Sequence, residues 1–112
     1  MSTSTVNVFP ATITSGNTDS SAVDVAENGV CGLEIPSAFT GSSISFKVTS
    51  NPNGTYQTLT NSDGTTYTLT VAAGKNIIVR PINLAGWRFM KLVSGSTESA
   101  DRKINIMARH VD

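Results

Sequence analysis

The clearest shortage in this sequence is of the residues that perform chemistry. Its 112 residues include one cysteine, Cys31, and one histidine, His110. A tetrahedral zinc site needs four ligands, so one residue of each kind is too few without distant carboxylates. A nucleophilic triad needs a rigidly held base, and a histidine next to the chain end is poorly placed for that role. We therefore expect no catalytic residue, no metal site and no cofactor, and we predict that the chain is not an enzyme.

Charge is scarce as well, at 14% of residues, with eight Lys and Arg against eight Asp and Glu. Nucleic-acid binding relies on clustered basic residues, and those near the C-terminus alternate with apolar residues beside Asp101 and Asp112. The acidic residues do not follow the spacing of a calcium loop. Asp24 and Glu27 flank an expected loop, which we interpret as solvated rather than metal-binding. We predict no nucleic-acid partner.

Long apolar runs are also missing, and we expect no signal peptide. No apolar segment approaches the roughly 20 residues of a membrane span, and residues 1–5 lack the basic and apolar regions of a signal peptide. A single cysteine forms no internal disulfide, and alternation predicts that Cys31 is a small buried residue on the same face as Leu33 and Ile35. These features predict no membrane association and synthesis in a reducing cytoplasm.

What the sequence does contain is alternation of apolar and polar residues, separated by turn signals. The run Ser43–Thr49 points three apolar residues to one face and its polar residues to the other, which is typical of a half-buried strand. Asp63-Gly64 predicts a hairpin turn. We predict one all-β domain over residues 1–112, an antiparallel, jelly-roll-like β-sandwich of eight or nine short strands. Residues 1–10 are expected to form an N-terminal arm or an edge strand. The expected strands lie near 5–9, 22–25, 30–35, 43–49, 55–60, 66–71, 76–80, 87–93 and 103–109, with single turns of helix at 36–39 and 84–86.

Two of these strands depart from clean alternation. Ile77, Ile78 and Val79 are apolar at consecutive positions, and residues 87–93 carry large apolar groups on both faces. Three explanations are open: both faces are covered by the chain, a bulge shifts the register, or a second subunit covers one face.

The stretch from Ile35 to Arg109 resembles small structural proteins of tailed bacteriophages with a jelly-roll or galactose-binding-like β-sandwich. The resemblance is carried by Ile35-Pro36-Ser37-Ala38-Phe39-Thr40-Gly41 with Ile44-Ser45-Phe46-Lys47-Val48, by Val71-Ala72-Ala73-Gly74-Lys75, and by Leu84-Ala85-Gly86-Trp87-Arg88-Phe89-Met90-Lys91-Leu92-Val93-Ser94-Gly95. It implies a virion component without enzymatic activity, a capsid decoration (cement) protein or a head or tail appendage, often oligomeric. Its partners would be the major capsid protein or other virion proteins, after synthesis in the host cytoplasm.

Two sets of residues are candidates for binding. Val6, Val8 and Phe9 are predicted to form a partner interface, by adding a strand to a neighbouring chain or to the capsid. The alternative function is that of a carbohydrate-binding module of a phage appendage, which recognises a surface glycan through Tyr56 and Trp87. Their exposure side by side would favour that alternative.

Overall fold

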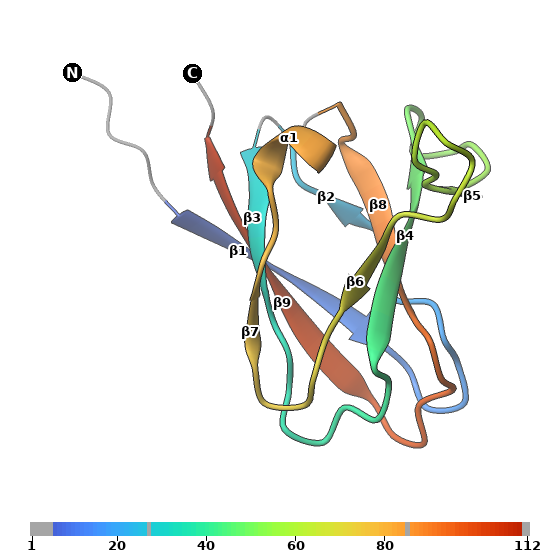
Figure 1. Cartoon of the computed structure of the whole chain (residues 1–112), viewed down its shortest axis with the longest axis vertical. Helices are drawn as coiled ribbons and strands as arrows, with labels where there is room; N and C mark the ends of the chain where they lie inside the picture. Colours follow the sequence, from blue (N-terminus) through green and yellow to red (C-terminus); the bar gives the residue numbers. More distant parts are fainter. Residues whose placement is uncertain (1–5, 27, 85, 111–112) are drawn as a thin grey trace.

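A computed structural model describes residues 6–26, 28–84 and 86–110, and shows two β-sheets packed face to face (Figure 1). All nine predicted strands are present, so the sandwich prediction is confirmed. The first strand is longer than expected, because it continues through Pro10 to Ile13. The elements are β1 (Val6–Ile13), β2 (Val23–Asp24), β3 (Asn28–Glu34), β4 (Ser43–Thr49), β5 (Gln57–Thr58), β6 (Thr68–Thr70), β7 (Asn76–Ile78), α1 (Pro81–Leu84), β8 (Phe89–Ser94) and β9 (Arg102–His110).

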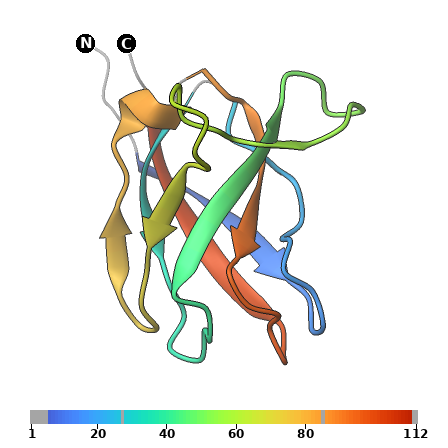
Figure 2. The same ribbon diagram turned by 45° about the vertical axis from the view of Figure 1, so that its right-hand side comes forward.

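The strand order is that of a jelly roll. One sheet has the order β1-β9-β3-β7, and the other has the order β2-β8-β4-β5, with β6 also paired to β4; every pair is antiparallel (Figure 2). β5 and β6 follow one another along the same side of β4. If they are counted as one interrupted edge strand, successive strands alternate between the two sheets except at the step from β4 to this edge strand, which is a hairpin within one sheet. This is the connectivity of a jelly roll built from two Greek keys.

The interruption of this edge strand is the hairpin that Asp63-Gly64 predicts. Leu59 donates its N–H to the carbonyl of Phe46, so the edge strand reaches past Thr58, and Tyr67 donates to the carbonyl of Leu59 where the chain returns. Gly64 occupies the turn with a φ of 92°, a conformation that favours glycine. The loop therefore projects from the sheet edge without disturbing the pairing on either side of it.

The core fills the space between the sheets and follows the alternation of the strands. Ile44, Phe46 and Val48 of β4 face inward, as their spacing predicts, and Phe46 is fully buried. Tyr67 is half-buried and lies with its ring centroid 5.8 Å from that of Phe46. The other sheet contributes side chains of β1, β3 and β9, namely Ala11, Ile13, Val30, Leu33, Ile104, Ile106 and Ala108.

One inward assignment is wrong, because β3 contains a bulge. The register of β3 against β9 shifts between Val30 and Gly32, which leaves Cys31 as the extra residue. Val30 and Leu33 face the core, and Cys31 is only partly buried, with its thiol donating to the carbonyl of Met107 at 3.4 Å. A bulge turns the residues after it to the opposite face, and simple alternation through Cys31 misses that change.

Candidate binding surfaces

An apolar row crosses the outer face of the four-stranded sheet. Val8 of β1 lies opposite Met107 of β9, and Met107 lies opposite Gly32 of β3. Gly32 in turn lies opposite Ile78 of β7. Residues directly opposite one another in antiparallel strands share a face. Val8 and Ile78 are 51% and 86% exposed, so the row Val8–Met107–Gly32–Ile78 faces solvent in the described chain.

Gly32 has no side chain, so nothing projects from the sheet surface at this position of the row. A Cβ atom at this position would lie 3.2 Å from the backbone carbonyl oxygen of Ile77 and 3.8 Å from the Cβ of Met107. A glycine within a strand commonly marks a place where another chain approaches closely. The row therefore has no side chain between Met107 and Ile78.

The outward residues of the two irregular strands differ in how far the described chain covers them. In β7, Val79 is buried beyond the strand end, Ile77 packs against the core and Ile78 is exposed, so the described chain leaves one face uncovered. In β8, Met90 and Leu92 are buried, and the outward residues are half-buried within the chain.

The predicted partner residues of β1 divide between the two faces of the sheet. Val6 and Val8 point outward and are about half exposed, whereas Phe9 packs against the core cluster. Val6 lies opposite Arg109 and beside the apolar row. The structure therefore keeps Val6 and Val8 together as a candidate surface and separates Phe9 from them.

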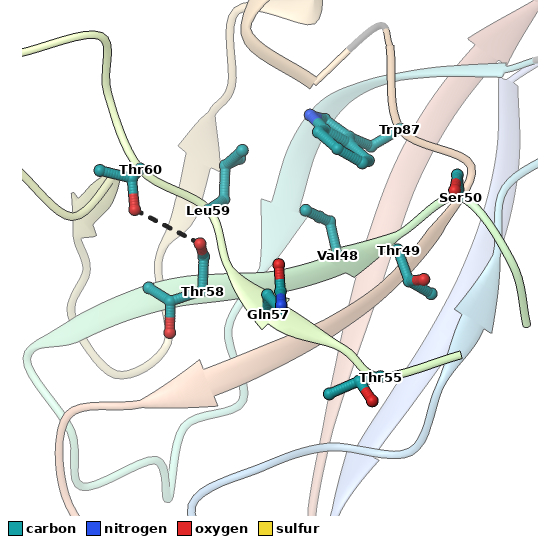
Figure 3. A pocket seen from close by; sticks show the side chains of 9 residues that line it. All are labelled: Val48, Thr49, Ser50, Thr55, Gln57, Thr58, Leu59, Thr60 and Trp87. Atoms are coloured by element: carbon teal, nitrogen blue, oxygen red, sulfur yellow. Dashed lines mark hydrogen bonds between the residues drawn. The ribbon is translucent and has the colours of Figure 1, made fainter. Parts of the chain in front are cut away.

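A pocket of about 350 Å³ opens at one end of the sandwich (Figure 3). Trp87 and Val48 form part of its wall, and Leu59 lies beside them. The remaining lining residues carry hydroxyl or amide groups, and they are Thr49, Ser50, Thr55, Gln57, Thr58 and Thr60. None of the described residues that line the pocket is charged, so their chemistry suits a neutral, hydroxylated molecule that can both donate and accept hydrogen bonds.

Tyr56 does not reach this pocket. Its ring lies under the ammonium group of Lys91, with Nζ 4.9 Å from the ring centroid. Lys91 stands between the buried residues Met90 and Leu92, so it points to the outer face of the five-stranded sheet. The structure therefore does not bring Tyr56 and Trp87 side by side; Trp87 is half-buried and packs against the core cluster.

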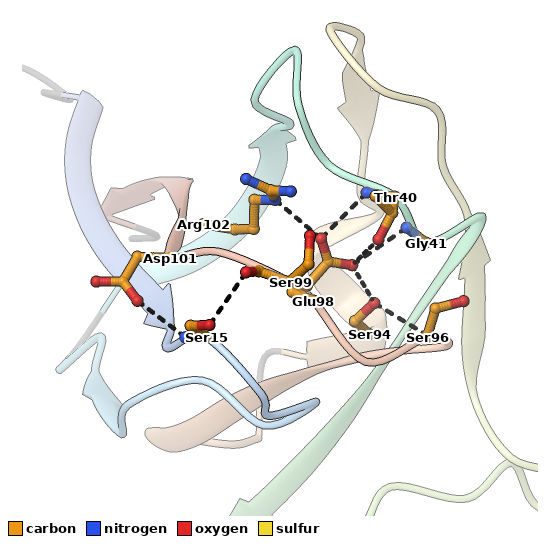
Figure 4. Close-up of polar contacts among 9 residues, drawn as sticks. All are labelled: Ser15, Thr40, Gly41, Ser94, Ser96, Glu98, Ser99, Asp101 and Arg102. Atoms are coloured by element: carbon orange, nitrogen blue, oxygen red, sulfur yellow. Dashed lines mark hydrogen bonds and ion pairs between the residues drawn. The ribbon is translucent and has the colours of Figure 1, made fainter.

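The most buried acidic group is Glu98, in the loop between β8 and β9 (Figure 4). Its carboxylate is fully buried and accepts hydrogen bonds from Thr40 N and Oγ1, Gly41 N and Ser94 Oγ. Arg102 Nε donates to Oε1 at 2.9 Å. Burial acts to raise the pKa of Glu98, but the hydrogen bonds from Thr40, Arg102 and Ser94 outweigh it and lower the pKa below its ordinary value.

This geometry assigns Glu98 to the framework. A general acid or base must reach a substrate, and each oxygen of this carboxylate is enclosed by donors of the chain itself. The carboxylate joins the loop after β3 to the loop before β9. Its sequence context, Ser-Thr-Glu-Ser, resembles a solvated loop and gives no signal of burial.

The other candidate metal ligands and catalytic groups do not form a site among the residues that the structure describes. Asp24 pairs with Arg88 at 2.8 Å and accepts the N–H of Ala26, while Glu27 and the side chain of His110 lie outside the described residues. The described residues contain no cluster of His, Cys, Asp or Glu that could hold a metal ion. They also contain no helix long and apolar enough to cross a membrane.

Comparison with known proteins identifies no relative: no family model, no curated protein and no solved structure matches this chain.

Proposed function

We propose that this chain is a non-enzymatic virion structural protein, a capsid decoration (cement) protein that stabilises the shell through protein–protein contacts. The observation that supports this role is the apolar row Val8–Met107–Gly32–Ile78 on a sheet face that the described chain leaves open. Exposed apolar residues that are contiguous on one face of a soluble domain are a feature of protein–protein interaction sites. The major capsid protein or another virion protein would cover it.

Copy number in purified particles tests this proposal. Quantitative mass spectrometry of intact particles should find the chain in a fixed and high ratio to the major capsid protein. A few copies per particle would indicate an appendage instead, and absence from particles would contradict a virion role.

Ile78→Lys is expected to weaken binding to the particle at least tenfold, because it places within the apolar contact a charge that would have to be desolvated there. Ile78 is 86% exposed, so the free energy of unfolding should change by no more than about 0.5 kcal/mol. Ile82→Lys is the matched control, since Ile82 is 78% exposed but lies in α1 outside the row. Equal binding by both variants in a particle pull-down would exclude the row as the contact surface.

A second candidate function is carbohydrate binding at an appendage, and the uncharged pocket beside Trp87 favours it. An indole ring stacks on the apolar face of a sugar, and hydroxyl groups serve both as donors and as acceptors. The ligand class would be a neutral glycan, because the lining residues that the structure describes include no cation to pair with a sugar acid or a phosphate.

Trp87→Ala is expected to reduce neutral-glycan binding at least tenfold in calorimetric titration, through loss of the stacking surface. Tyr56→Ala should leave binding unchanged, because Tyr56 lies under Lys91 and away from the pocket. Gln57→Ala, which removes a polar group of the lining, separates loss of binding from any loss of folding in Trp87→Ala. Equal losses in the Trp87 and Tyr56 variants would contradict this location of the site.

A further inference from the structure

The outer edge of β1 offers main-chain hydrogen-bonding groups. β1 is an edge strand with β9 on its inner side. On its outer side, Thr12 N donates to Ser21 Oγ at 3.3 Å, and Ser21 N donates to the carbonyl of Thr12 at 2.9 Å. Main-chain groups alternate in direction along a strand, and the register with β9 is continuous from Val6 to Ile13. The N–H and C=O groups of Val6 and Val8 therefore point outward, as those of Thr12 do.

Pro10 supports this assignment independently. Proline has no N–H, so within a strand it is tolerated where that position faces away from the ladder. Pro10 falls in the same alternating set as Val8 and Thr12, and its missing donor lies on the open edge. In the described part of the chain, no hydrogen bond uses the outward groups of Val6 or Val8.

We propose that β1 pairs with β1 of a second copy of this chain. The two strands run antiparallel about a twofold axis beside Asn7, so that Val6 of each copy lies opposite Val8 of the other. The two four-stranded sheets then form one continuous eight-stranded sheet. This inference goes beyond the virion role, and it can fail or succeed without affecting it.

The register follows from the groups available. With Val6 opposite Val8 of the second copy, every outward N–H and C=O of both valines is paired. If Val8 lay opposite Val8 of the second copy instead, Val6 would lie opposite Pro10 of that copy. The Val6 carbonyl would then find no donor, because proline has no N–H. The proposed register therefore leaves no group of the two valines unpaired.

A second copy suits this edge better than an unrelated strand. Close to a twofold axis, the same residues of the two copies lie near one another. A charged residue there would face a like charge, which is destabilising. β1 has the sequence VNVFPATI, which contains no charged residue. The half-exposed side chains of Val6 and Val8 would form cross-strand pairs on the outer face, next to Met107 of each copy. Asn7 is already engaged with Asn28 Oδ1 at 3.0 Å and requires no new partner.

The proposed pairing predicts a specific cross-link. Asn7 would lie opposite Asn7 of the second copy as a non-hydrogen-bonded pair, with Cα atoms about 4.5 Å apart, which suits a disulfide. Asn7→Cys, in a Cys31→Ser background, should form a covalent dimer under mild oxidation. Val8→Cys in the same background is the control, because the two introduced thiols would be diagonal, with Cα atoms about 7–8 Å apart.

A second variant tests the hydrogen bonds. Val8→Pro removes the outward N–H and leaves the β9 ladder in place, so two hydrogen bonds are lost per dimer. The dimer dissociation constant from sedimentation equilibrium should rise about 30-fold. A chain that sediments as a monomer at high concentration and forms no Asn7→Cys cross-link would overturn the proposal. Cross-linking through Val8→Cys in place of Asn7→Cys would overturn the register.

Discussion

Glu98→Gln is expected to lower the free energy of unfolding by about 3 kcal/mol, because it leaves buried donors without an acceptor. One carboxylate oxygen accepts from Thr40 N and Arg102 Nε, and the other accepts from Thr40 Oγ1, Gly41 N and Ser94 Oγ. A glutamine side chain has one oxygen and one NH₂ group. Whichever way it is turned, its NH₂ group faces a backbone N–H that needs an acceptor.

Urea unfolding followed by circular dichroism measures this loss. Asp101→Asn is the matched control, because Asp101 accepts the N–H of Ser15 at 2.8 Å but lies exposed at the same end of the molecule. We expect a change of no more than about 0.5 kcal/mol there. Equal unfolding midpoints for Glu98→Gln and the parent chain would show that the enclosed carboxylate does not stabilise the fold.

The pH dependence of the free energy of unfolding is a second test of whether the Glu98 carboxylate stabilises the fold. The folded-state pKa of Glu98 is lowered from its ordinary value of 4.5, so the carboxylate contributes stability above that pH. That contribution is lost as the pH falls through the lowered pKa of the folded state. The parent chain should therefore lose stability on acidification more steeply than Glu98→Gln does.

Phe46→Ala is expected to cost about 4 kcal/mol, since it removes the largest fully buried side chain from the centre of the sandwich. Phe46 lies opposite Leu92 in the β4–β8 pair and contacts Tyr67, so neither neighbour can fill the space without moving a strand. A loss of this size is a large share of the stability of a small domain.

Phe89→Ala is the control for this substitution in the same strand pair. Phe89 lies on the outer side of β8, where the guanidinium carbon of Arg88 is 5.1 Å from its ring centroid. We expect a loss of about 1 kcal/mol there, because the cavity opens to solvent. Similar losses for the two phenylalanines in urea unfolding would mean that the core is not centred on Phe46.

The strands could be predicted from sequence because each depends on its own alternation. Ser43–Thr49 buries Ile44, Phe46 and Val48 as its pattern requires. The inward prediction for Cys31 is wrong because a bulge breaks the alternation without changing the composition of the strand.

The candidate surfaces were harder to predict, because they depend on which strands are neighbours. Val8, Met107, Gly32 and Ile78 are far apart in the sequence, and only the register of four strands aligns them. The local sequence feature that indicates an apolar outer face is the run of consecutive apolar residues at 77–79. The burial of Glu98 likewise depends on contact between two loops that are distant in the sequence. The residues around Glu98 give no indication of that contact.

The interruption of the edge strand by the loop between β5 and β6 limits how many neighbours this fold can accept by strand addition. A new strand laid along that edge would collide with the loop after two or three residues. The β2 and β7 edges are two and three residues long, so they too are short templates. Among the edge strands that the structure describes, β1 is the longest, but Ser21 already pairs with Thr12 on its outer side. Twofold pairing through Val6 and Val8 would use the open part of this edge in both molecules. The molecule is in effect monovalent for strand addition, so that association through its edges would stop at two copies rather than continue into a fibre.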